Sequence, residues 1–389
     1  MRRKVLYVIS SFGTGGICRA LQNTLNLYDT EKYDVDVFTL IHEGLYNGEF
    51  KHCKVLKRNY LLEVICLNYY SLRGAKRIVG YFAKALNKLL GGKLMAFVMG
   101  RVANFLLKKG NYDAVIAYSE GLPTKFIAEA KHNNKVAWIH CDYQSYLKIS
   151  PIDEQKIYEK IDKVICVSDY TRKSFLQVYP NFAEKTKFVY NVLDVQFIKQ
   201  QSFEDIFPCY EKKNINIVSV GRIDSVKRFS SIPAIVKKLK KKHRVKWYIV
   251  GPAVGNHSEY NKLVENIKTH GVEEEVTLLG EKSNPYPYIR HADILACTSI
   301  SEACPYVINE AKILGVPIVC TNFGSSIEFI ENNEEGVITS IEKFHEVIEK
   351  LIENKKFYNH IKFRLGGFEY KNEDIMSNIY ALIDMNGII

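Results

Sequence analysis

Short apolar runs alternate along this chain with stretches in which apolar residues recur every three or four positions. The run KVLYVIS at residues 4–10 is broken off by Ser10, Ser11 and glycines, which favours a strand over a signal peptide. Similar runs follow at residues 33–41, 113–119, 135–141 and 163–168, and a second series occupies residues 215–221, 245–251, 275–280, 292–299 and 316–321. Strands that alternate with crossover helices form parallel sheets covered on both faces. The pattern therefore predicts an α/β protein with two doubly wound parallel sheets.

A polar stretch with poor periodicity, residues 191–214, separates the two series of strands. It predicts a linker near residue 195, an N-terminal Rossmann-like domain at residues 1–195 and a C-terminal one at residues 196–367. A helix at about residues 368–389 is expected to pack back on the first domain. Open parallel sheets bind ligands beyond the carboxyl ends of their strands. The site is therefore expected in a central cleft that the two domains face.

The composition of the 389-residue chain is that of an ordinary globular protein, with 47% hydrophobic and 25% charged residues. No apolar run approaches the length of about 18 residues that crosses a bilayer. Nine cysteines are scattered without C-x-x-C pairs, which predicts reduced thiols, a cytoplasmic location, and neither disulfides nor structural zinc. The triplet His140-Cys141-Asp142 is not expected to hold a metal, because alternate residues of a strand point to opposite faces.

The net charge of +11 is concentrated in one segment. Residues 51–109 contain thirteen Lys and Arg against one acid, Glu63, so this segment carries +12 and the remainder of the chain −1. One helical stripe of the segment is apolar and another is basic: Ile78, Phe82, Ala85 and Leu89, and Arg77, Lys84 and Lys88. Such a helix either lies on an anionic membrane surface or packs on a sheet with its basic face in solvent. A nucleic-acid interface is not indicated, since no binding motif accompanies the charge.

A glycine-containing loop, SSFGTGGICRALQN at residues 10–23, follows the first strand. Gly15 and Gly16 would let the backbone approach an anion at the N-terminus of the next helix. The loop is not a Walker phosphate loop, because no G-K-[ST] follows. It nearly matches the G-x-G-x-x-G dinucleotide fingerprint, but Cys18 stands at the third glycine position, which disfavours a nicotinamide cofactor. A tight turn without a ligand is the other interpretation.

Two cations follow the first strand of the second series, in VGRIDSVKRF at residues 220–229. Arg222 offers a planar fork of donors and Lys227 a compact point charge, a pairing suited to a diphosphate. In a chain this basic the two cations alone would mean little. Their place at the carboxyl edge of a sheet is what indicates a diphosphate site.

Two glutamates eight positions apart mark the segment SEACPYVINEAKILGVPIVC. Glu302 lies in the loop after a strand, Pro305 suits the first turn of a helix, and Gly315 suits its end. The N–H groups near Tyr306 and Val307 would point at an anion in front of this helix. Glu310, further into the helix, could accept two hydrogen bonds from a vicinal diol such as a ribose. The alternative is a surface acid without a ligand.

GRIDSVKR together with EACPYVINEAKILGVPIVCTNFGSSIEFI resembles the signature of the retaining GT-B glycosyltransferases, the large nucleotide-sugar-dependent family with the E-x(7)-E motif found in bacterial polysaccharide and envelope glycan synthesis. GTGGICRAL resembles the family's N-terminal glycine loop, and AWIHCD its strand end with a histidine, here His140. The resemblance spans roughly residues 3–335. The chain departs from the family pattern at Arg228, where a glycine is customary, and at Ala303-Cys304, where Gly-Phe is customary.

The resemblance implies a hexosyltransferase that moves a sugar from a nucleotide sugar, most often a UDP-sugar, to a glycan or lipid-linked acceptor with retention of configuration. Arg222 and Lys227 would stabilise the leaving diphosphate, His140 and Glu302 would address the donor sugar, and Glu310 the ribose. No metal or other cofactor would be required. The basic segment implies a peripheral position on the inner face of the membrane. Two rival interpretations are a GT-B sugar-nucleotide epimerase and a non-catalytic protein that binds membranes or polyanions.

Overall fold

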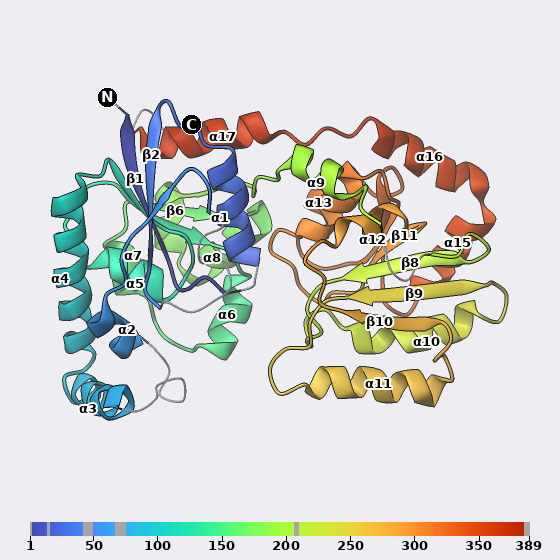
Figure 1. The fold of residues 1–389 in the computed structure, drawn as a ribbon, viewed down its shortest axis with the longest axis horizontal. Helices are drawn as coiled ribbons and strands as arrows, with labels where there is room; N and C mark the ends of the chain where they lie inside the picture. Colours follow the sequence, from blue (N-terminus) through green and yellow to red (C-terminus); the bar gives the residue numbers. More distant parts are fainter. Residues whose placement is uncertain (1, 14–15, 42–49, 67–74, 206–209, 385–389) are drawn as a thin grey trace. The chain divides into compact units, whose positions relative to one another are not determined.

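The computed structural model describes residues 2–13, 16–41, 50–66, 75–205 and 210–384. They form two compact units, Met1–Leu193 together with Lys371–Ile389, and Asp194–Tyr370. Each unit is built around one parallel sheet covered by helices (Figure 1). The predicted α/β class with two doubly wound parallel sheets is confirmed.

The N-terminal unit contains a seven-stranded sheet in the order β3-β2-β1-β4-β5-β6-β7. All pairs are parallel, and the order reverses between β1 and β4. The strands are β1 Arg3–Ile9, β2 Tyr33–Thr39, β3 Lys54–Val55, β4 Ala114–Ala117, β5 Lys135–Ile139, β6 Lys163–Cys166 and β7 Thr186–Phe188. Five of them coincide with predicted runs. The edge strands β3 and β7 were not predicted, because two or three residues are too few to show a period.

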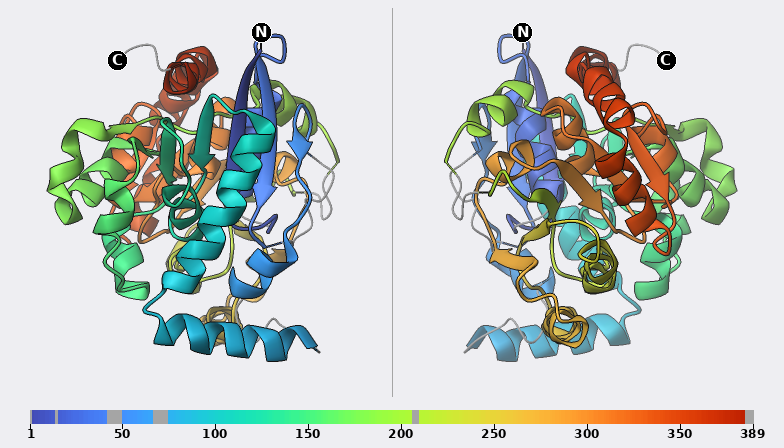
Figure 2. Two further views of the ribbon diagram at one scale, coloured as in Figure 1. Left: turned by 90° about the vertical axis from the view of Figure 1, so that its left-hand side faces the viewer. Right: turned by 90° about the vertical axis from the view of Figure 1, so that its right-hand side faces the viewer.

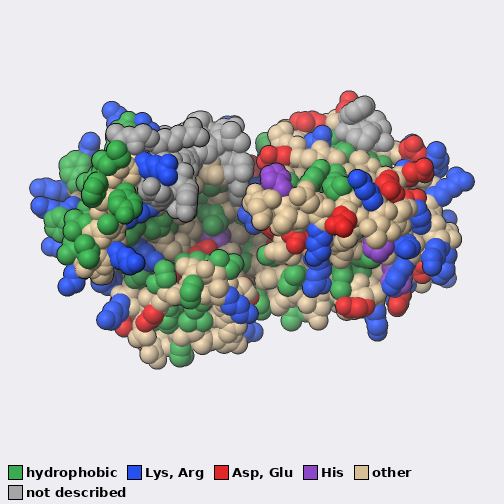
Figure 3. Space-filling view, turned by 90° about the horizontal axis from the view of Figure 1, so that it is seen from below, with side chains coloured by type: hydrophobic (Ala, Val, Ile, Leu, Met, Phe, Trp, Pro, Cys, Tyr) green, Lys and Arg blue, Asp and Glu red, His purple; other side chains and the backbone are tan. Residues whose placement is uncertain are grey.

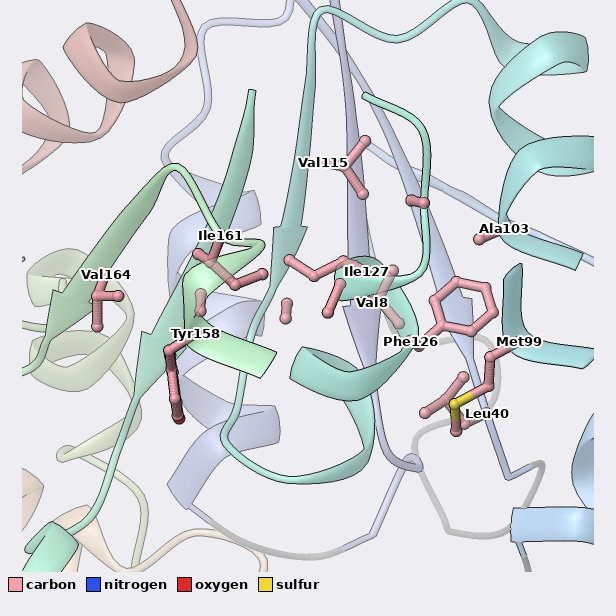
Figure 4. Close-up of a cluster of buried hydrophobic side chains, with 14 of the residues drawn as sticks. Val8, Leu40, Met99, Ala103, Val115, Phe126, Ile127, Tyr158, Ile161 and Val164 are labelled. Atoms are coloured by element: carbon pink, nitrogen blue, oxygen red, sulfur yellow. The ribbon is translucent and has the colours of Figure 1, made fainter. Parts of the chain in front are cut away.

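Helices on both faces of this sheet enclose the core of the N-terminal unit. The helices of this unit are α1 Gly16–Asn26, α2 Tyr60–Cys66, α3 Ala75–Leu89, α4 Lys93–Gly110, α5 Leu122–Ala128, α6 Tyr143–Ile149, α7 Gln155–Glu159, α8 Asp169–Val178 and α17 Asn372–Ile383. Figure 4 shows Met99 of α4 and Phe126 of α5 against Val8 of β1 and Leu40. The near-complete burial of β1 explains why its sequence is an unbroken apolar run rather than an alternating one.

Helix α17, the last in the chain, belongs to the N-terminal unit. The ring of Tyr380 stacks on Tyr33 of β2 with centroids 4.5 Å apart, and Lys163 Nζ of β6 donates a hydrogen bond to Leu382 O at 2.9 Å. Asp29 N donates to the Tyr380 hydroxyl at 2.8 Å. These contacts attach α17 beside strands β1 and β2 (Figure 1).

The C-terminal unit contains a six-stranded parallel sheet in the order β10-β9-β8-β11-β12-β13. Its strands are β8 Ile215–Val220, β9 Val245–Val250, β10 Val276–Gly280, β11 Ile294–Cys297, β12 Ile318–Thr321 and β13 Gly336–Thr339, of which only β13 was not predicted. Its helices are α9 Val195–Gln201, α10 Ile232–Leu239, α11 Ser258–His270, α12 Tyr286–Arg290, α13 Tyr306–Ile313, α14 Ser326–Phe329, α15 Phe344–Glu353 and α16 Lys355–Gly366.

Part of the polar stretch at residues 191–214 is helical. Helix α9 lies within it, capped by Asp194, whose Oδ1 accepts a hydrogen bond from Phe197 N at 3.0 Å. Ile198 is buried, and Asn284 Nδ2 donates to Gln201 O at 2.9 Å. The sequence did not indicate this helix at residues 195–201, because one buried apolar residue in a short helix gives no readable period.

The basic segment presents its apolar stripe to solvent. On α3, Ile78, Phe82 and Leu89 are 63%, 66% and 84% exposed. Helices α3 and α4 meet at a bend of 111° (Figure 2), and Figure 3 shows apolar and basic side chains interspersed over this part of the N-terminal unit. Taken singly, none of the described helices is long and apolar enough to cross a membrane, whereas α3 and α4 satisfy that test as a bent pair. The second interpretation required the apolar stripe to pack on a sheet with the basic face in solvent. The exposed stripe does not agree with it.

Candidate functional site

The candidate donor residues follow two neighbouring strands of the C-terminal sheet. β8 leads into residues 221–228, and β11, which pairs with it in parallel, leads into residues 298–305. The strand order reverses at this pair, since β9 lies beyond β8 and β12 beyond β11. Both loops therefore leave the same edge of the sheet at its topological switch point, where open α/β sheets bind ligands.

Two glycines shape the loop after β8. Gly221 and Gly251 have φ angles of +152° and +149°, which L side chains rarely adopt. A Cβ on Gly251 would lie 1.8 Å from the Gly221 carbonyl oxygen, and a Cβ on Gly221 would lie 3.1 Å from Cε of Lys227. Glycine at these positions lets the ends of β8 and β9 approach each other and leaves room for the stem of Lys227.

The two loops are joined through their backbones. Thr298 Oγ1 donates a hydrogen bond to Lys227 O at 2.8 Å, and Ile300 N donates to Val226 O at 2.8 Å. These bonds hold the backbone around Lys227 against the end of β11. Its side chain is thereby directed toward the loop that contains Glu302.

Lys227 and Glu302 form an ion pair. Lys227 Nζ lies 2.5 Å from Glu302 Oε1, and Ser299 Oγ donates to the same oxygen at 2.6 Å. The two charged side chains are 19% and 14% exposed. Burial lowers the pKa of Lys227, but the Glu302 carboxylate together with Cys297 and Asp224 outweighs this effect, so the pKa is raised above its ordinary value. Lys227 is therefore a fixed cation at the carboxyl edge of the sheet.

Arg222, the second predicted cation, lies in the same loop but is not part of this pair. Its side chain is 57% exposed, and its Nη2 lies 3.3 Å from Asp224 Oδ2. The structure thus places both predicted diphosphate cations in one short loop. Lys227 is held by a partly buried partner, whereas Arg222 has the exposure needed to move onto a ligand.

Three hydroxyl residues that the sequence analysis did not single out support Glu302. Ser299 contacts its carboxylate, Ser325 Oγ donates to its backbone oxygen at 2.7 Å, and Thr321 Oγ1 donates to Ser299 O. The first two are almost completely buried. Their signal in the sequence is weak: each is a small polar residue at the end of a strand or shortly after it, Ser299 after β11, Thr321 at the end of β12 and Ser325 after it.

Helix α13 begins at Tyr306, directly after Pro305, so Tyr306 and Val307 supply its first N–H groups, as predicted. It ends in a Schellman motif in which Val316 N donates to Ala311 O at 2.9 Å and Gly315 adopts φ +68°. Glu310 is only 2% exposed, which excludes the interpretation as a surface acid.

In the N-terminal unit, His140 directly follows β5, as expected. Its backbone N donates to Glu120 Oε2 at 3.0 Å, and its ring lies 4.8 Å from that of Tyr118. Burial lowers the pKa of His140 to about 3, so the imidazole is neutral at physiological pH. Within the described part of the chain, its Nε2 is buried and has no hydrogen-bond partner. A neutral imidazole can donate or accept a hydrogen bond, but it supplies no charge.

Glu120 is a second residue that the sequence analysis missed. It follows β4, the neighbour of β5, so its carboxylate meets the backbone of His140 at the same sheet edge. Burial raises the pKa of Glu120, against the opposing effect of the hydrogen bonds from the His140 N–H and the Cys141 thiol. Asp142 makes separate contacts, accepting hydrogen bonds from Ser145 Oγ at 2.8 Å and the Tyr170 hydroxyl at 3.1 Å.

The glycine loop is described in part. Gly15 lies outside the described residues. Gly16 is the first residue of α1 and is exposed, with nothing within 4 Å of the place a Cβ would take. Cys18, at the third position of the near-match to the dinucleotide fingerprint, is buried, and its thiol donates to Ser11 O at 3.3 Å.

Two family profiles match this chain, one in each half. Residues 14–197 match the profile "Glycosyltransferase Family 4", and residues 200–364 match the profile "Glycosyl transferases group 1". The matches meet close to the division between the two structural units.

Similar proteins and structures agree with these profiles. The N-acetylgalactosamine-N,N'-diacetylbacillosaminyl-diphospho-undecaprenol 4-alpha-N-acetylgalactosaminyltransferase of Campylobacter jejuni is 24% identical over 90% of this chain and 89% of its own. The crystal structure of Anabaena Alr3699/HepE in complex with UDP and glucose has a TM-score of 0.72 at 19% identity, over 98% of this chain and 100% of that one. A glycosyltransferase from Rickettsia africae has a TM-score of 0.75 at 15% identity, over 99% and 100%. The fold is that of GT-B glycosyltransferases.

Proposed function

Since this chain belongs to the GT-B glycosyltransferases, with one family profile matching each half, we propose that it transfers a hexose from a UDP-sugar to a glycan or lipid-linked acceptor with retention of anomeric configuration. The observation that carries the proposal is the pairing of Lys227 with Glu302 beside Arg222, at the switch point of the C-terminal sheet. Two cations that could bind a diphosphate and a carboxylate that could bind a sugar hydroxyl thus follow two neighbouring strands.

The C-terminal unit would bind the donor. Arg222 and Lys227, with the N–H groups of Tyr306 and Val307, would contact the diphosphate, and Glu310 would accept hydrogen bonds from the ribose. Breaking the bond between sugar and phosphate leaves negative charge on the diphosphate, and fixed cations and helix N–H groups stabilise that charge in the transition state. These groups can do so without a metal ion, so we expect transfer to be metal-independent.

Glu302 and His140 would address the transferred sugar. Glu302, held by Ser299, can accept a hydrogen bond from a sugar hydroxyl, and the neutral His140 ring can donate or accept one. Gly15 and Gly16 would let the backbone of the glycine loop approach the donor. In a retaining transfer the acceptor oxygen attacks from the face that the diphosphate leaves, and the departing phosphate oxygen takes up the acceptor proton.

We propose a peripheral position on the cytoplasmic face of the membrane, through the basic segment at residues 51–109. Helix α3 carries exposed apolar residues and the cations Arg77, Lys84 and Lys88, the combination by which an interfacial helix binds anionic lipid. The Campylobacter relative, as named, acts on an undecaprenol-linked diphosphate, and an acceptor of that kind would lie at such a surface.

A donor and acceptor screen tests the proposed function. UDP-sugars are first ranked by the rise they produce in the thermal midpoint, since a ligand stabilises the folded state by mass action. Each donor that binds is then incubated with undecaprenyl-diphosphate-linked glycans, and the anomeric configuration of the product is read by NMR. We expect UDP release that depends on the acceptor, and a product with the configuration of the donor. Conversion of the donor without an acceptor would instead indicate an epimerase, and binding of no nucleotide sugar would contradict the proposal.

A further inference from the structure

Asp224 is an acid placed between the two cations of the proposed diphosphate site. One carboxylate oxygen, Oδ1, accepts a hydrogen bond from Lys227 N at 3.0 Å, and the other, Oδ2, lies 3.3 Å from Arg222 Nη2. Its side chain is 19% exposed. One carboxylate therefore contacts both residues that would bind the donor's diphosphate.

The contact with Lys227 fixes the turn. Asp224 accepts a hydrogen bond from the N–H of Lys227, and Thr298 donates one to the carbonyl oxygen of the same residue. Both polar groups of the Lys227 backbone are therefore held. An acceptor for a turn N–H three residues ahead stabilises the turn as an N-cap stabilises a helix. The direction of the Lys227 side chain, toward Glu302, depends on this arrangement.

The contact with Arg222 has another consequence. A phosphate entering beside Arg222 would meet the negative charge of Asp224, which already attracts that guanidinium. Asp224 is therefore a poor ligand for the donor, and it competes with the donor for Arg222.

We propose that Asp224 is a positioning residue of the donor site. It holds the turn that carries Lys227, and it keeps Arg222 close to the diphosphate position until the diphosphate of an incoming donor takes the place of Asp224 on Arg222. This inference rests on the proposed function, since it concerns the same nucleoside diphosphate site. It predicts that loss of the Asp224 charge strengthens diphosphate binding, and that loss of the hydrogen bond that holds the turn weakens it.

Two substitutions separate these effects. Asp224→Asn keeps an oxygen for the Lys227 N–H but removes the charge, so UDP should bind about fivefold more tightly than to wild type. Asp224→Ala removes both, so kcat should fall about tenfold, the change that corresponds to the loss of one capping hydrogen bond, and UDP should bind no more tightly than to wild type. Uridine, which has no phosphate, should bind all three proteins alike.

The matched control is Asp194→Ala. Asp194 caps α9 through the same contact, from its Oδ1 to a backbone N three residues ahead at 3.0 Å, but in another part of the unit. It should lower the thermal midpoint as Asp224→Ala does and leave kcat and UDP affinity unchanged. Asp224→Ser, whose hydroxyl can accept the same N–H without a charge, should bind UDP as tightly as Asp224→Asn does. If the Ala variant does not fold, Asn and Ser variants that bind UDP no more tightly than wild type overturn the inference.

Measurements of UDP affinity by calorimetry and of steady-state kinetics decide the matter. If Asp224→Asn and Asp224→Ala change the affinity for UDP in the same direction, the positioning role is overturned. It is also overturned if Asp194→Ala lowers kcat as much as Asp224→Ala does. If wild type binds UDP but no Asp224 variant differs from it, the inference fails and the proposed function stands. If wild type binds none of UDP, GDP and ADP, the proposed function fails as well.

Discussion

Lys227 and Glu302, 75 residues apart in the sequence, are joined by a contact of 2.5 Å between Nζ and Oε1. The proposed roles of the two residues differ, since Lys227 would stabilise the diphosphate and Glu302 would hold the sugar. Their opposite charges neutralise each other in this pair. A diphosphate that binds Lys227 would therefore compete with Glu302, so we expect the affinity for the nucleotide to depend on the residue that is proposed to bind the sugar.

This competition predicts the effect of Glu302→Gln. Sequence reasoning alone predicts that nucleoside diphosphate binding stays nearly unchanged, because the residue addresses the sugar. With the ion pair removed, we expect UDP to bind about fivefold more tightly while transfer falls about a hundredfold. Glu335→Gln is the matched control, because Glu335 forms a similar pair with Lys312 at 2.7 Å in the same unit. An unchanged UDP affinity in calorimetry would show that the pair does not oppose binding.

Substitution of the two cations should affect the transition state more than the ground state. Arg222→Ala and Lys227→Ala should each lower kcat by about a hundred- to a thousandfold, or about 2.7–4 kcal/mol of barrier, with a smaller loss of donor affinity. Lys238→Ala, which removes an exposed cation of α10, should change neither. The measurement is kcat and donor KM from UDP release. A rise in KM with unchanged kcat would assign the two residues to binding alone.

Long apolar strands could be predicted from the sequence, but the pairing of side chains between loops could not. β1 and β8 are buried runs bounded by polar residues, whereas β3 has two residues and no period. Glu302 could be recognised by its place after a strand. Lys227 could be recognised in the same way, but its contact with Glu302 could not, because that contact depends on β8 and β11 being neighbours, and the order of strands in a sheet is not written in either segment. The contact between Glu120 and His140 escaped prediction for the same reason, since it needs β4 beside β5.

The pKa of His140 predicts how stability depends on pH. The folded value of about 3 lies below the ordinary value of 6.5, so between these values the unfolded chain binds a proton that the folded chain does not. Stability should therefore fall as the pH drops below about 6.5, by up to about 1.4 kcal/mol per pH unit from this residue. His140→Asn removes this contribution. The difference in thermal midpoint between variant and wild type should shift in favour of the variant from pH 7 to pH 5. A constant difference would contradict the burial of a neutral imidazole.

Arg228 occupies a backbone conformation that favours glycine, with φ +54°. The family pattern has glycine at this position, and the structure gives the reason. Arg228→Gly should relieve the left-handed strain and stabilise the protein by about 0.5–1 kcal/mol, after the larger entropy of the unfolded chain is subtracted. Arg228→Ala keeps the strain and should not be more stable than wild type. Asn333→Gly is a second comparison, because Asn333 also has a positive φ, +67°, but asparagine tolerates that region and should gain less. The stabilities of the three variants are compared by their denaturant midpoints. Equal midpoints for Arg228→Gly and Arg228→Ala would show that the backbone at Arg228 is not strained.

The exposed apolar residues and the cations of α3 predict that this helix binds an anionic membrane surface. Phe82→Ser and Leu89→Ser remove exposed apolar groups, and Lys84→Glu and Lys88→Glu reverse charges on the same helix. Each cation near an anionic surface contributes about 1 kcal/mol, so each charge reversal should weaken binding to vesicles that contain phosphatidylglycerol by fivefold or more, at about 0.1 M salt. Phe363→Ser is the apolar control, because Phe363 is 82% exposed on α16 of the other unit, and Lys241→Glu is the charge control. Both should bind like wild type. Co-sedimentation that ignores anionic lipid and salt, or that the control variants weaken as much as the α3 variants, would remove α3 as the membrane contact and leave the proposed glycosyl transfer untouched.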